Sequence, residues 1–85
     1  MARQARLIVP GELHHVLQRG NNRQAVFLDD EDRHAYLHAL REATRLQGVR
    51  VHAYVLMPNH VHLLVTPQEE HSLARAMQTL GRRYV

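Results

Sequence analysis

Apolar and polar residues alternate with a period of two in three segments of the chain and recur with a helical period in two others. The alternating segments, 13–19, 49–57 and 60–66, predict β-strands, because successive side chains of a strand point to opposite faces of a sheet. The helical periods predict helices over 30–47 and 72–85. The expected order is strand, helix, strand, strand, helix. This order begins a ferredoxin-like α+β fold, with an antiparallel sheet and helices on one of its faces.

Local signals set the ends of these elements. The acidic run at 29–32 begins the first helix, because an Asp cap accepts backbone N–H bonds and acidic side chains suit the positive end of the helix dipole. Gly48 ends that helix, and Pro58 and Asn59 form a tight turn that predicts antiparallel pairing of the strands on either side. A full ferredoxin-like unit needs one more strand. We therefore expect residues 1–85 to form a single domain that is incomplete at its C-terminus.

The strand over 60–66 carries histidine where a purely apolar strand is expected. Its apolar members Val61, Leu63 and Val65 form one face, which should pack under the helices. His60 and His62 then project together from the open face of the sheet. Neutral imidazole is a common metal ligand, and two such rings can converge on one ion. The alternative is a chance pair on a wet strand face, since the chain has eight histidines.

Three further strand positions bear on this site. His14 and His15 are adjacent, so their side chains point to opposite faces, and we interpret them as a chance pair. Strict alternation within 49–57 puts Tyr54 on the face opposite Val51, which predicts that Tyr54 shares the face of His60 and His62 and lines the site.

Composition narrows the class of protein. The 85 residues suit one small domain, and the lack of cysteine leaves His, Asp, Glu, Asn, Gln or water as a third metal ligand. No run approaches the roughly 18 apolar residues of a membrane span, so we expect no membrane partner and a cytoplasmic location. All 11 basic residues are arginine and the formal net charge is +3. Arginine suits phosphate, and a positive chain is compatible with nucleic acid.

Polar residues that can contact phosphate gather at two places in the sequence. Aromatic residues make up only 5% of the chain, which disfavours a base-stacking platform for single-stranded nucleic acid and leaves contacts to the phosphate backbone. For each arginine, the alternative to a phosphate contact is an ordinary solvent-exposed side chain on the surface. The candidates are Arg6, Arg19, Asn21, Asn22 and Arg23 in the first strand and its loop, with Arg82 and Arg83 in the second helix.

The segment MPNHVHLLV at 57–65, preceded by VHAYVL, closely resembles the signature of the HUH-type tyrosine transposases of small insertion sequences. The best match is their REP-associated tyrosine transposase subgroup. Residues 11–37 resemble the N-terminal strand, loop and first helix of that family, and residues 72–85 resemble its second helix. The resemblance therefore covers nearly the whole chain.

This resemblance implies metal-dependent cleavage and strand transfer of single-stranded DNA during transposition, at elements that carry hairpins. A tyrosine hydroxyl of the family attacks the phosphodiester and forms a covalent 5′-phosphotyrosine. The resemblance also implies that His60 and His62 hold a divalent metal ion, magnesium or manganese, whereas an imidazole pair taken alone suits zinc or manganese. A homodimer is a further expectation.

The nucleophile is harder to find within this chain. In the family it lies several dozen residues after the histidine pair, on a later helix, and a polar third metal ligand follows one turn later. Tyr84 comes 22 positions after His62 (84 minus 62) on the apolar face of its helix, as a packing residue would. We expect the nucleophile beyond Val85, with Tyr84 as the candidate inside the chain. The alternatives are a non-catalytic DNA-binding fragment or decayed transposase, and a small metal-binding protein unrelated to DNA.

Overall fold

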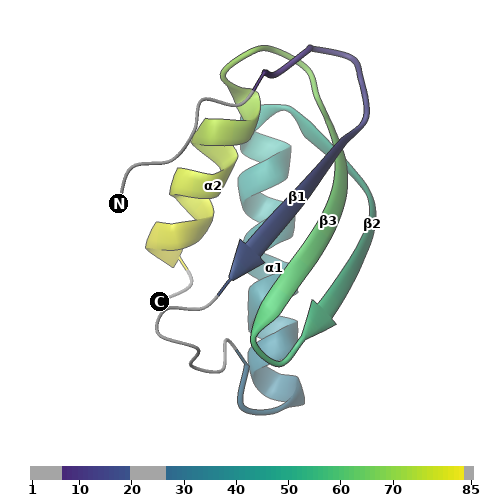
Figure 1. Cartoon of the computed structure of the whole chain (residues 1–85). Coiled ribbons are helices and arrows are strands. Elements are labelled where there is room, and N and C mark those ends of the chain that lie inside the picture. Colours follow the sequence, from purple (N-terminus) through teal and green to yellow (C-terminus); the bar gives the residue numbers. More distant parts are fainter. Residues whose placement is uncertain (1–6, 20–26, 84–85) are drawn as a thin grey trace.

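Strands and helices form where the sequence predicts them. The computed structural model describes residues 7–19 and 27–83, and both helices lie on one face of a three-stranded sheet (Figure 1). The predicted α+β class is confirmed, and within the described residues each predicted boundary is met to within one residue. The elements in chain order are β1 His14–Arg19, α1 Asp30–Gln47, β2 Val49–Met57, β3 His60–Pro67 and α2 Ser72–Arg83.

The ends of α1 follow the predicted capping chemistry. Asp29 is the N-cap, and its Oδ1 accepts a hydrogen bond of 2.9 Å from the backbone N–H of Asp32. Gly48 closes the helix with φ 73° and ψ 45°, a left-handed conformation, and its N–H donates to the carbonyl of Thr44. A Cβ at Gly48 would also lie 2.7 Å from Oε1 of Gln68. Glycine is therefore favoured here by the left-handed backbone conformation, whereas the amide oxygen of Gln68 ends a flexible side chain that could move aside.

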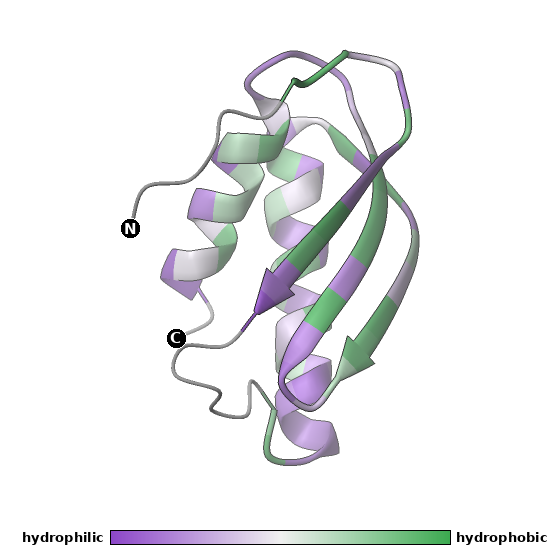
Figure 2. Cartoon of the chain, in the orientation of Figure 1, coloured by the Kyte–Doolittle hydropathy of each residue, from purple (hydrophilic) through white to green (hydrophobic). Residues whose placement is uncertain are grey.

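The sheet has β3 at its centre, in the order β1-β3-β2, and both pairings are antiparallel. Alternate residues of β3 differ in hydropathy, as the banding of this strand shows (Figure 2). Val61, Leu63 and Val65 are buried against the helix layer, as predicted, and the other residues of β3 before Pro67 are half-buried or exposed. The helices contribute most of the remaining core, namely Tyr36, Ala39, Leu40 and Ala43 from α1 and Leu73, Ala76 and Leu80 from α2, and Val16, Phe27 and Val49 complete it.

A β-bulge interrupts the pairing of β2 with β3. Val51 pairs with Val65, but the next partner of β3, Leu64, pairs with Ala53. His52 is the additional residue between them, and its Nε2 lies 2.7 Å from the hydroxyl oxygen of Thr66. Because a bulge adds one residue to one strand only, it exchanges the two faces for the rest of that strand.

The bulge makes the prediction for Tyr54 wrong. Tyr54 pairs with Leu63 and therefore lies on the helix side of the sheet. It is 50% exposed there, so it is not part of the buried core. Val55 and Met57, which strict alternation assigned to the other face, instead lie on the open face of the sheet, opposite the histidines of β3. Strict alternation failed because it cannot register an extra residue in one strand.

Neither helix in the described ranges is long and apolar enough to cross a membrane.

Substitution at neighbouring positions of β3 tests the two faces. Leu63→Ala should lower the free energy of unfolding by about 2–5 kcal/mol, because the fully buried side chain leaves a cavity. Leu64→Ala, at a position 37% exposed on the open face, should cost less than about 1 kcal/mol. Urea unfolding followed by circular dichroism measures both. Equal losses would contradict the assignment of the faces.

Candidate metal and DNA site on the open face of the sheet

His60 and His62 lie together on the open face of β3, as predicted. Both are half-buried, and their ring centroids are 5.0 Å apart with an angle of 75° between the ring planes. Among the described residues, no group of three or more His, Cys, Asp and Glu side chains has an arrangement that could hold a metal ion. The described part of the chain thus offers this imidazole pair but no complete set of protein ligands.

The turn residue next to His60 fixes the direction of its ring. Nδ1 of His60 lies 2.7 Å from Oδ1 of Asn59. An amide oxygen only accepts hydrogen bonds, so Nδ1–H of His60 is the donor. The proton of the neutral ring is therefore on Nδ1, and Nε2 keeps the lone pair that a metal ion requires. This places a suitable donor atom on the open face.

A third imidazole belongs to the same cluster, and the sequence analysis missed it. Nε2 of His15 lies 2.9 Å from Nδ1 of His62, and the two rings lie edge to edge, with centroids 5.1 Å apart and planes 13° apart. The register of β1 and β3 explains the contact: His15 pairs with Leu64 and Leu17 pairs with His62, so the two histidines are diagonal neighbours. The prediction that His15 was half of a chance pair is therefore wrong for His15.

His14 has a different, structural role on the other side of the strand. Its Nδ1–H donates to the carbonyl of Glu12 at 2.8 Å, and its Nε2 accepts the backbone N–H of Val9 at 3.2 Å. The adjacent histidines thus point to opposite faces, as predicted. His14 holds the segment that leads into β1, and only His15 reaches the site.

Arg19 is a predicted phosphate contact that lies on the histidines' face. It is exposed and pairs with His60 in the register of β1 and β3, so the two side chains leave the sheet on the same side. Arg6, Asn21, Asn22 and Arg23 were predicted to act with it, and Tyr84 was the candidate nucleophile. All five lie outside the described residues.

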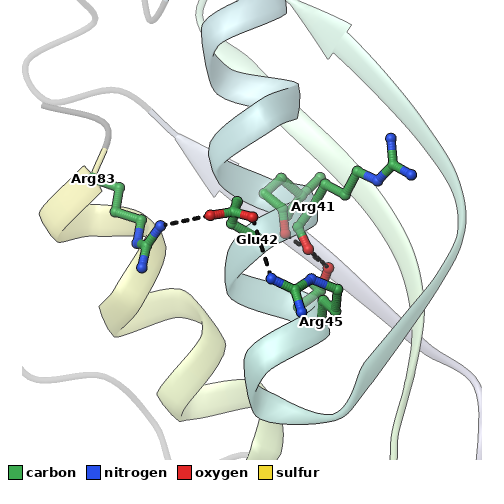
Figure 3. Close-up of polar contacts among 6 residues, drawn as sticks. Arg41, Glu42, Arg45 and Arg83 are labelled. Carbon is green, nitrogen blue, oxygen red and sulfur yellow. Dashed lines mark hydrogen bonds and ion pairs between the residues drawn. The ribbon is translucent and has the colours of Figure 1, made fainter.

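The other predicted arginines belong to the helix layer instead. Nη1 of Arg83 donates to Oε1 of Glu42 at 3.0 Å, and Nη2 of Arg45 donates to Oε2 of the same carboxylate at 3.3 Å (Figure 3). The hydrogen bond from Arg45, followed by the positive charges of Arg45 and Arg83, holds the pKa of Glu42 below its ordinary value. Glu42 thus links α1 to α2, and the fold does not bring Arg82 or Arg83 together with the histidines.

Neither tyrosine in the described ranges lies on the histidines' face. Tyr36 on α1 is only 2% exposed, and its hydroxyl donates to Oε1 of Gln18 at 2.8 Å within the core side of the sheet. Tyr54 is on the helix side because of the bulge. A phosphate bound beside His60 would therefore be separated from both hydroxyl groups by the sheet.

Comparison with known proteins identifies the class of protein. Residues 11–85 match the family described as Transposase IS200 like, and the chain belongs to this family. The fold is similar to that of a solved structure described as "Structure of the REP associates tyrosine transposase bound to a REP hairpin". The two are 17% identical with a TM-score of 0.70, over 96% of this chain and 52% of that one. This chain therefore spans about half the length of that protein. A search of curated proteins gave no match.

The carboxylate of Glu42 should make stability depend on pH. Because its pKa is lower in the folded chain than in the unfolded one, its contribution is present above the unfolded pKa of about 4.3 and disappears as pH falls through the folded pKa. Glu42→Gln should lower Tm slightly at pH 7, since exposed ion pairs are screened by water.

The difference in Tm between Glu42→Gln and the unchanged protein should close below about pH 4. Glu70→Gln is the matched control, because Glu70 is an exposed carboxylate in the connection from β3 to α2. Thermal unfolding from pH 3 to 8 measures all three proteins. A Tm difference for Glu42→Gln that stays constant across this range would contradict the ion-pair origin.

Proposed function

We propose that this chain is the metal-binding and DNA-binding part of an enzyme that cleaves and rejoins single-stranded DNA at hairpin elements during transposition. The main support comes from the open face of β3, where His60 and His62 lie next to each other. The hydrogen bond from Nδ1 of His60 to Asn59 leaves Nε2 of His60 available to a metal ion. Membership of the IS200-like transposase family, which generally uses divalent metals, supports the same conclusion.

His60 and His62 are the residues that would hold the divalent ion, through Nε2 of each ring. A divalent ion at this position would polarise a phosphodiester oxygen of the DNA. Nitrogen ligands suit manganese better than magnesium, which prefers oxygen, so manganese is the better probe of the site. The remaining ligands would be water, phosphate oxygens or residues outside the described ranges.

The covalent step needs a tyrosine hydroxyl on the same side of the sheet as the histidines. Its oxygen would bond to phosphorus while the bond from phosphorus to the 3′ oxygen breaks, and the departing oxygen would take up a proton as a 3′-hydroxyl. Tyr36 and Tyr54 lie toward the helix side, so neither can attack in line. The proposal therefore assigns the nucleophile to a residue outside the described ranges.

A non-catalytic DNA-binding domain is the second candidate function. It is favoured by the same observation that neither described tyrosine shares the histidines' face. The coding sequence after the codon for Val85 distinguishes the two functions. A tyrosine followed four residues later by Asn, Gln or Glu in a helical pattern would support the enzyme, whereas a stop codon would support the binding domain.

The histidine pair should bind Mn²⁺ without contributing much to folding. His60→Ala and His62→Ala should each weaken Mn²⁺ binding by at least about 100-fold, since each removes a ligand, and should change the free energy of unfolding by less than about 1 kcal/mol. His38→Ala, at an exposed position of α1, is the control and should leave Mn²⁺ affinity unchanged. The free Mn²⁺ signal in electron paramagnetic resonance measures affinity. Unchanged affinity in both site variants would overturn the proposed metal site.

Arg19 should contact the DNA backbone, because it lies on the same face as the histidines. Arg19→Gln should weaken binding of hairpin DNA with a single-stranded flank by about threefold to tenfold, and should reduce the slope of log affinity against log salt by about 0.7. Arg82→Gln, on the helix layer, is the matched control and should have a smaller effect. Fluorescence anisotropy at several salt concentrations gives both quantities. Equal effects of the two substitutions would exclude the open face as the DNA surface.

A further inference from the structure

His15 has no role in the proposed function so far, although its ring touches one of the two histidines. We propose that His15 is a positioning residue for the metal site: its Nε2 accepts the Nδ1–H of His62, which leaves Nε2 of His62 free for a divalent cation. This inference rests on the proposed function, because it assumes that His62 is a metal ligand. It is carried by the 2.9 Å contact between the two nitrogens and by the small angle of 13° between the ring planes, which suits an in-plane hydrogen bond.

The direction of this contact separates His15 from the cation in this arrangement. Nε2 of His15 faces Nδ1 of His62, whereas the proposed cation binds Nε2, the other nitrogen of the His62 ring. At 2.9 Å the two facing nitrogens share a proton. His15 therefore acts on the cation only through His62.

Two positions of the shared proton are chemically different for the site. If Nδ1 of His62 carries the proton, Nε2 has a free lone pair and can bind a cation. If Nε2 of His15 carries it, Nδ1 of His62 is the acceptor and the neutral ring of His62 holds its own proton on Nε2, which blocks coordination there. Only the first arrangement matches the state of His60, whose proton is held on Nδ1 by Asn59.

The sheet makes this arrangement rigid. His15 is in β1 and His62 in β3, 47 positions apart, and backbone pairing of the two strands holds the rings in contact. The two ring planes are only 13° apart, so the hydrogen bond lies nearly in the plane of both rings and restricts rotation of the His62 ring. A partner of this kind fixes the tautomer and direction of a metal-binding histidine, and its loss typically costs 10–100-fold in metal affinity.

Two substitutions of His15 separate ring shape from hydrogen bonding. His15→Phe keeps a flat aromatic ring but removes the acceptor, whereas His15→Gln removes the ring but offers an amide oxygen to Nδ1–H of His62. His34→Phe on the exposed side of α1 is the matched control for the added aromatic ring. Circular dichroism checks that each protein is folded.

Two quantities are measured on each protein. The first is the tautomer of His62 in the metal-free chain, from long-range ¹⁵N–¹H correlation spectra, with His62→Ala to assign the signals. The second is Mn²⁺ affinity. We expect the unchanged protein to show the Nδ1–H form of His62. His15→Phe should lose this preference and bind Mn²⁺ about 10–100-fold more weakly, and His15→Gln should recover most of both.

The possible failures are distinguishable. Mn²⁺ binding that depends on His60 and His62 but is unchanged, with the same His62 tautomer, in His15→Phe would overturn the role of His15 and leave the proposed function intact. An Nε2–H tautomer of His62 in the unchanged protein would also overturn it, whether or not the variants fold. Absence of Mn²⁺ binding in the unchanged protein would overturn the proposed function and the role of His15 together.

Discussion

Burial of one side of β3 is the constraint on which the rest of the structure depends. Val61, Leu63 and Val65 are each at most 1% exposed, and they lie at the centre of both the sheet and the core. Because strand side chains alternate, this burial forces the two histidines between and beside them onto the opposite face. A slip of one residue would bury the imidazoles and expose the core, so the apolar residues determine where the candidate site can form.

The same separation of faces divides the polar residues of the chain into two groups. Glu42, Arg45 and Arg83 join the two helices on the outer layer, where they stabilise helix packing. Arg19 and the three histidines share the open face, where a phosphate and a cation could meet. The two groups are on opposite sides of the sheet, so Arg19 does not share a surface with Arg45 and Arg83.

The two imidazoles of the candidate site are oriented by different means. His60 takes its partner from the preceding residue, Asn59, so its direction is encoded locally in the turn. The hydrogen-bond partner of His62 is His15, which only the folded sheet brings near.

This difference between local and long-range partners also explains what the sequence could predict. Capping by Asp29 and Gly48 is local, and the helix ends were predicted correctly. The bulge at His52 and the contact of His15 depend on strand pairing, so alternation within single segments could not reveal them.

Pulsed electron paramagnetic resonance of Mn²⁺ bound to the chain most directly tests whether the open face of β3 is a metal site. Electron spin echo modulation counts the imidazole nitrogens bonded to the ion. The geometry predicts two directly bonded nitrogens, with one lost in His60→Ala, one lost in His62→Ala and both still present in His15→Gln. Spectra without directly bonded imidazole nitrogen, or with modulation that persists unchanged when both histidines are replaced, would contradict the account.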